Sequence, residues 1–186
     1  MKQIEQLLVQ HCAPTLAGLK TANMFTYCCQ NKMELRKILR HCNAHFKHTD
    51  LCIMPLRKVN KRTLLYVYHK EQLMRDIQTN EVKAILQKCH YPTHNPMRCL
   101  VHLAKRMKSQ TDFPHEIGCF LGYPPEDVLG FMENTKTCKC VGCWKVYGDE
   151  TKAKSTFERY KQCTHAYCKR WENGVSFSQL AGTAYT

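Results

Sequence analysis

The chain has 186 residues, of which 44% are hydrophobic and 10% aromatic, and its formal net charge is +13 at pH 7. Burial of this much apolar surface can offset the entropy of ordering, which excludes a disordered chain, and the length predicts one domain over residues 1–175 with a C-terminal tail over 176–186. No apolar run approaches the roughly 20 residues of a membrane span, which argues against a membrane protein.

The first part of the chain is predicted to contain helices followed by a β-hairpin. Residues 2–12 carry apolar side chains at helical spacing. Asn31, with Glu34 three residues later, is a capping-box pattern that predicts the start of another helix. The segment 51–70, LCIMPLRKVNKRTLLYVYHK, has two β-rich runs around a polar turn. It predicts an antiparallel hairpin that is buried on both faces.

The second part of the chain is predicted to be mainly helical. Residues 82–89 and 95–107 carry apolar side chains every three or four positions, which predicts two helices. The segment 141–148, VGCWKVYG, predicts a third strand, and a long helix is expected to begin near Asp149. Together these elements predict an α+β fold, a single helix-rich domain of about seven or eight helices with a small antiparallel sheet of about three strands.

One segment of this basic chain is acidic. Residues 111–134, TDFPHEIGCFLGYPPEDVLGFMEN, contain five of the fifteen acids and no Lys or Arg. Their hydrophobic pattern matches a helix-turn-helix unit, but a recognition helix needs donors and cations, whereas Glu126, Asp127 and Glu133 would meet the phosphates of DNA. The charge therefore argues against sequence-specific DNA binding. It favours a structural pair of helices whose acids pair with basic residues of the same chain.

Cysteine usage indicates the compartment. The thirteen cysteines are an odd number, and the length does not need disulfides for stability. The N-terminal segment carries Glu5, Gln6 and Gln10 where a signal peptide needs an unbroken apolar core. Reduced thiols in a cytoplasmic protein are therefore expected, most of them acting as small apolar side chains.

Four segments carry a family resemblance: HCAPTLAGLKTANMF, LLYVYHKEQL, FPHEIGCFLGYPPEDVLGFMEN and WKVYGDETKAKSTFERYKQC. They resemble an uncharacterised bacterial family, domain of unknown function 3793, which is found chiefly in anaerobes. The resemblance runs from about residue 7 to residue 170, and the first and third segments are long enough to be specific. It implies a small cytosolic protein and carries no activity or cofactor over to this chain.

A cysteine and a histidine are candidate catalytic residues. Cys12 precedes Pro14, which suits a first helical turn, so the helix dipole is expected to lower the pKa of this thiol and make it a nucleophile. The string Cys-Ala-Pro-Thr-Leu-Ala is similar to the nucleophile helix of some papain-like cysteine peptidases. His115 would be the base, with Glu116 or Asn23 orienting it, on a small acyl or thiol substrate. His115 opens a predicted helix, whereas the papain-like histidine lies on a strand.

The alternative to catalysis is a structural role for the same residues. Cys12 would then pack in the core, and Glu116 would reach back to the free amides of its own helix N-terminus. Lys20 and Asn23 follow a glycine and are candidates for holding a phosphate or carboxylate near Cys12. Tyr123 is a further candidate ligand-binding residue.

Metal binding is another hypothesis. Cys138, Cys140 and Cys143 form a C-x-C-x-x-C pattern that suggests zinc or an iron–sulfur cluster, although both normally take four ligands. A second candidate chelate, with one-turn spacing on a predicted helix, consists of His41, His45 and His48. A solvated basic face is the alternative for these histidines.

Three classes of function remain open after sequence analysis: a thiol-dependent enzyme, a metal- or redox-linked cysteine module, and a basic protein that binds an anionic partner. A small-molecule or anionic ligand is compatible with each of them. Neither the substrate nor the oligomeric state follows from the sequence, and whether the chain is an enzyme stays open.

Overall fold

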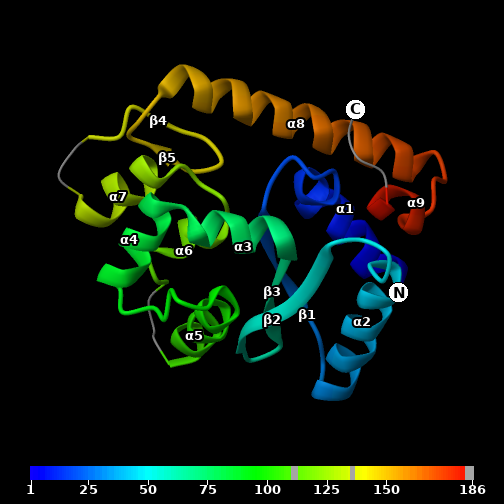
Figure 1. Cartoon of the computed structure of the whole chain (residues 1–186). Coiled ribbons are helices and arrows are strands. Elements are labelled where there is room, and N and C mark those ends of the chain that lie inside the picture. The colour runs from blue at the N-terminus through cyan, green and yellow to red at the C-terminus, as the bar shows by residue number, and fades with distance from the viewer. Residues whose placement is uncertain (110–112, 135–136, 183–186) are drawn as a thin grey trace. The chain divides into compact units, whose positions relative to one another are not determined.

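The structure is a computed structural model that describes residues 1–109, 113–134 and 137–182 (Figure 1). Two units are distinguished: unit 1 comprises Met1–Glu71 and Tyr160–Thr186, and unit 2 comprises Gln72–Arg159. The predicted α+β class is confirmed, since helices accompany a three-stranded and a two-stranded antiparallel sheet. Within the described ranges, no helix is both long enough and apolar enough to cross a lipid bilayer.

The sheet of unit 1 has the strand order β1-β3-β2, with antiparallel neighbours. Its strands are β1 (Ala22–Cys28), β2 (Leu51–Val59) and β3 (Arg62–His69). The hairpin predicted over residues 51–70 is confirmed as β2 and β3, with Asn60 in the left-handed conformation (φ 54°) at the turn. The central strand is buried on both faces as predicted, because Leu65, Tyr66 and Val67 are all fully buried.

The third strand of this sheet comes from an unexpected segment. The sequence pattern predicted it over residues 141–148, but β1 occupies the position and pairs with β3. The signal in β1 is an alternation in which Phe25 and Tyr27 are buried while Thr26 and Cys28 are exposed. The segment 141–148 instead contributes to a short hairpin in unit 2, formed by β4 (Cys140–Val141) and β5 (Lys145–Val146).

The described part of unit 1 also contains three further helices and the end of α8 (Glu150–Glu172), a helix that begins in unit 2. They are α1 (Lys2–Leu16), α2 (Lys32–His45) and α9 (Phe177–Gly182). Helix α1 packs against β1 and β3, α2 packs against β2, and α9 contacts both helices. The predicted cap of α2 is confirmed, because Asn31 Oδ1 accepts a hydrogen bond of 2.9 Å from the Glu34 amide.

Helix α1 is longer than predicted and runs through Cys12 and Pro14. Pro14 therefore does not open a helix, and the expectation that it lies in a first turn is wrong. The helix ends before Gly18, which has a φ of +73°. Glycine adopts this left-handed conformation without steric cost, so Gly18 suits the position that follows the end of the helix.

Unit 2 is built from short helices around the β4–β5 hairpin. Its helices besides the start of α8 are α3 (Lys70–Gln78, which begins within unit 1), α4 (Asn80–Lys88), α5 (Pro96–Ser109), α6 (Ile117–Phe120) and α7 (Pro125–Glu133). Helix α7 packs against α4, α6 and β5, an arrangement visible in Figure 1. Helix α3 was not predicted, whereas the helices over 82–89 and 95–107 were.

The last described helix belongs to the core of unit 1. The side chains of Phe177, Leu180 and Ala181 are at most 3% exposed and join the same cluster as the buried face of α1. Gly174, with a φ of +83°, allows the chain to turn after α8 so that α9 returns to this core. The predicted tail therefore begins too early, since residues 177–181 are packed.

We predict that Phe177→Ala lowers the free energy of unfolding of unit 1 by about 3 kcal/mol, because truncation of a buried phenylalanine leaves a cavity. Urea denaturation followed by circular dichroism measures the effect. Met33→Ala is the control, since Met33 is 68% exposed in the same unit. Equal stability of the two variants would show that α9 behaves as a tail.

Candidate functional site

Asp127 organises the centre of unit 2 from the first turn of α7. Its Oδ1 atom accepts hydrogen bonds from the backbone amides of Tyr147 (2.6 Å) and Gly148 (2.7 Å), and its Oδ2 atom accepts one from Trp144 Nε1 (2.7 Å). The residue is only 3% exposed. A buried carboxylate is stable when donors satisfy its oxygens, so this acid joins α7 to the segment 144–148.

Two glycines allow α6, α7 and this segment to approach closely. A Cβ atom on Gly130 would overlap the ring of Tyr147, and one on Gly118 would lie 2.7 Å from Val128 Cγ2. Neither contact leaves room for a side chain at the glycine position. The two glycines therefore allow the close packing of the walls around the site.

The Asp127 connection borders a pocket of about 180 Å³ within unit 2. The walls consist mainly of apolar atoms, and the Trp144 ring stacks on the Tyr123 ring with centroids 4.8 Å apart. The lining residues are His115, Ile117, Gly118, Tyr123, Asp127, Val128, Phe131, Trp144 and Lys145. The predicted residues His115 and Tyr123 thus lie in one pocket.

Two of the lining residues, Lys145 and His115, have side chains that can carry a positive charge. Lys145 is exposed, and its ammonium lies 5.4 Å from the centroid of the Phe131 ring. The exposed His115 ring meets the same phenylalanine edge-on, with centroids 4.9 Å apart. No acid in the described part of the chain forms an ion pair with Lys145. The pocket therefore combines an apolar interior with a cation that has no counterion among the residues that the structure describes.

Glu116 does not have the role that the sequence suggested. It occupies the N-cap position of α6 without making a side-chain cap hydrogen bond, so the predicted capping is wrong. Its buried carboxylate accepts a hydrogen bond of 2.8 Å from the Tyr91 hydroxyl and lies 3.3 Å from Arg106 Nε. Burial and then the Glu116 charge raise the pKa of Tyr91. Glu116 thus pairs with a basic residue, as the structural hypothesis predicted.

Cys12 lies inside unit 1 and is fully buried. Burial raises the pKa of its thiol strongly, and the nearby Lys20 charge offsets this only in part. The shift has the opposite sign to the one predicted, because burial disfavours the thiolate and because Cys12 lies near the C-terminal end of α1 instead of before a helix N-terminus. The neutral thiol is favoured, and the pairing of Cys12 with His115 of unit 2 stays a prediction.

The other predicted ligand-binding residues of unit 1 are largely enclosed. Lys20 is 6% exposed, and its ammonium lies 6.0 Å from the centroid of the Tyr160 ring. Asn23 Oδ1 accepts a hydrogen bond of 2.7 Å from Thr15 Oγ1. Lys20 is close enough to Cys12 to affect its pKa, so part of the predicted neighbourhood exists, within the protein interior.

The cysteines proposed as metal ligands are in and beside the β4–β5 hairpin. Cys140 belongs to β4, Cys143 is exposed in the turn, and Cys138 precedes the strand. The sulfurs of these three residues do not all lie within 4.8 Å of one another. Among the described residues, one group of three potential metal ligands meets this spacing, and it belongs to unit 1. The structure therefore gives no geometric support to a zinc or iron–sulfur site at these cysteines.

Phe131, Trp144 and Lys145 are among the pocket residues that were not predicted from the sequence as site residues. The adjacent Trp and Lys in the segment WKVYG were interpreted only as part of a strand. An aromatic residue beside a cation could have suggested a binding site. The position of Lys145 beside Phe131, however, depends on the Asp127 hydrogen bonds, which join α7 to this segment.

These features define an α+β protein with a small apolar pocket and a cation among its lining residues. The chain belongs to the family described as "Protein of unknown function (DUF3793)", which matches residues 8–181 and confirms the resemblance inferred from the sequence. No curated protein and no solved structure matches the chain.

We predict that Cys12 reacts with iodoacetamide at neutral pH at least about a hundredfold more slowly than the exposed Cys28 and Cys143, because alkylation requires an accessible thiolate. Timed labelling followed by peptide mass spectrometry measures the three rates. Urea-unfolded protein is the control in which the rates converge. Preferential labelling of Cys12 in the folded protein would support the catalytic hypothesis and contradict this expectation.

We predict that Asp127→Asn destabilises unit 2 by about 3 kcal/mol, since an amide offers one acceptor atom to the three donors that face Asp127. Trp144 fluorescence during urea unfolding measures the effect in a Trp171→Phe background, where Trp144 is the single tryptophan. Glu133→Gln is the matched control, because this acid of the same helix is exposed. Equal destabilisation by both substitutions would refute the role of Asp127.

Proposed function

We propose that the protein binds a compact carboxylate with a flat apolar body in the unit 2 pocket. The body would lie between Trp144 and the apolar walls, and the carboxylate would meet Lys145 and His115. The observation that carries this proposal is the Lys145 ammonium in the lining of an otherwise apolar pocket, with no acid of the described residues in an ion pair with it. An ammonium without a counterion favours an anionic group on the ligand.

The internal carboxylate of the pocket supports an anionic ligand rather than a cationic one. Both oxygens of Asp127 already accept hydrogen bonds from protein donors, so this acid has little need of a cation from the ligand. An aromatic pocket without Lys145 would instead suit a quaternary ammonium. The charge of Lys145 favours an anionic ligand instead.

The dimensions of the pocket limit the size of the ligand. Its volume of about 180 Å³ lies below the range of roughly 300–1,000 Å³ that is usual for drug-sized ligands. One aromatic ring with a short acidic side chain is of suitable size. Stacked and edge-on aromatic rings in the walls favour a planar body.

The proposed location is the cytoplasm. All thirteen cysteines are free thiols, and several of them are exposed or half-buried. Such thiols are maintained in a reducing compartment. The proposed ligand is accordingly a small intracellular acid.

We predict that phenylacetate binds to the pocket and that Lys145→Gln lowers its affinity about tenfold, the loss of one charge-assisted contact at a partly exposed site. Trp144 fluorescence in the Trp171→Phe background measures binding. Phenylacetamide has the same ring without the charge, so its weaker binding is expected to change little in the variant.

Lys152→Gln is the matched control, because Lys152 is an exposed lysine of unit 2 that does not line the pocket. Its affinity for phenylacetate is expected to equal that of the unsubstituted protein. The proposal would be overturned if Lys145→Gln bound phenylacetate as tightly as the unsubstituted protein does. It would also be overturned if the unsubstituted protein did not prefer phenylacetate to phenylacetamide.

A further inference from the structure

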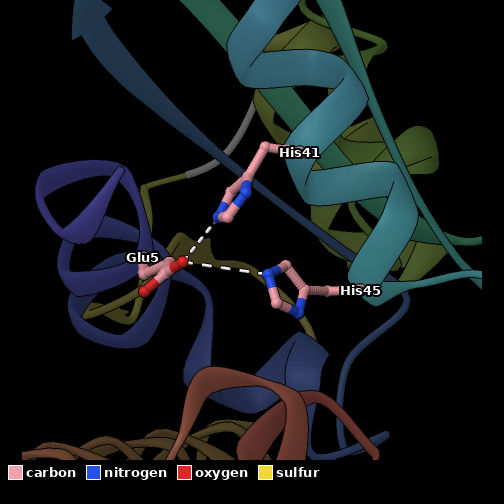
Figure 2. A group of neighbouring side chains, drawn as sticks. All are labelled: Glu5, His41 and His45. Atoms are coloured by element: carbon pink, nitrogen blue, oxygen red, sulfur yellow. Dashed lines mark hydrogen bonds and ion pairs between the residues drawn. The ribbon is translucent and has the colours of Figure 1, made fainter.

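A group of potential metal ligands lies in unit 1, independent of the pocket. Glu5 projects from α1, and His41 and His45 project from successive turns of α2, so that the side chains point toward one another (Figure 2). One donor atom from each residue lies within 4.8 Å of the other two. The i, i+4 spacing places both imidazoles on one helix face.

The distances are close to those of a metal centre. Glu5 Oε1 lies 2.5 Å from His41 Nε2 and 3.8 Å from His45 Nε2. Tetrahedral zinc with bonds of about 2.0–2.1 Å holds its ligand atoms roughly 3.3 Å apart. Shifts of about 0.8 Å or less would bring each of these two distances to that spacing.

A neighbouring helix orients one of the imidazoles. His45 Nδ1 lies 2.6 Å from Ser178 Oγ of α9, and the His45 ring packs edge-on against Phe177 with centroids 5.4 Å apart. When Nδ1 donates its proton to the serine, the lone pair of Nε2 faces Glu5. Hydrogen bonds of this kind from outside the ligand set fix the tautomer and direction of metal-binding histidines.

The burial of the group suits a bound ion that remains accessible. The side chains of His41, His45 and Glu5 are 26%, 25% and 14% exposed. Partial removal from water strengthens the attraction between the carboxylate and a cation. The remaining exposure leaves a path for the ion and for one further ligand.

We propose that Glu5, His41 and His45 form a zinc-binding site with three protein ligands and one open position. Two imidazoles and one carboxylate suit zinc, whereas magnesium and calcium prefer oxygen ligands throughout. Three protein ligands are typical of sites where water or a substrate group occupies the fourth position. His48, the third histidine of the sequence pattern, is exposed and outside the group.

Cobalt(II) titration of the full chain, freed of metal with a chelator, tests the site. Cobalt replaces zinc with similar ligands and gives visible absorption bands, and bound thiolates add intense near-ultraviolet charge-transfer bands. We expect one equivalent of cobalt with visible bands and without thiolate bands. Glu5→Gln, which preserves the side-chain size, is expected to lower the affinity more than about a hundredfold, and Ser178→Ala about tenfold.

His48→Ala is the control and is expected to bind cobalt as the unsubstituted chain does. Circular dichroism establishes that each variant is folded, and His41→Gln replaces Glu5→Gln if the latter does not fold. Absence of binding, thiolate bands in the main complex, or unchanged affinity in the ligand variants would overturn the zinc site. A thermal shift on zinc addition that disappears in the ligand variants would support it independently.

Discussion

The buried carboxylate of Asp127 connects two parts of unit 2 that are separated in sequence. Three donors of the segment 144–148 converge on it, including the indole of Trp144. Since the same indole forms a wall of the pocket, the shape of the pocket is set by a contact that lies largely out of reach of solvent. Loosening this contact would affect the positions of both Trp144 and the neighbouring Lys145, and the glycines opposite leave little space for rearrangement.

Local patterns determined how much of the fold could be predicted. The hairpin, the cap at Asn31 and the helical stretches follow from alternation, capping chemistry and helical spacing, all of which act over a few residues. Strand β1 was missed although Phe25 and Tyr27 alternate with exposed residues, because pairing with β3 is a contact across some forty positions. The sequence around Pro14 was compatible with two helix boundaries, and the packing of α1 against the sheet selected one of them.

In the candidate sites, too, residues within local motifs could be predicted, whereas contacts between distant segments could not. His115 was predicted as a base and Tyr123 as a ligand-binding residue because they stand in a distinctive segment; both line the pocket, and their roles stay predictions. Phe131 lacked a local signal, and the adjacent Trp and Lys were not enough to place Lys145 in the pocket, since its position beside Phe131 depends on the fold of unit 2. The sequence suggested His41 and His45 as a chelate but not Glu5, which lies 36 positions away from His41 on another helix. For Cys12, the local motif suggested a reactive thiol, but the side chain is buried by contacts with distant residues that no local pattern reveals.

The order of the two units along the chain bears on how the protein is made. Unit 2 is one continuous stretch, whereas unit 1 combines residues before Gln72 with residues after Arg159. A ribosome releases the chain from its N-terminus, so unit 2 can fold while the sheet of unit 1 still lacks α9 and the end of α8. During that interval the apolar face of α1 that later receives Phe177 and Leu180 is uncovered. Chaperones that shield apolar surfaces would have their target there, on α1.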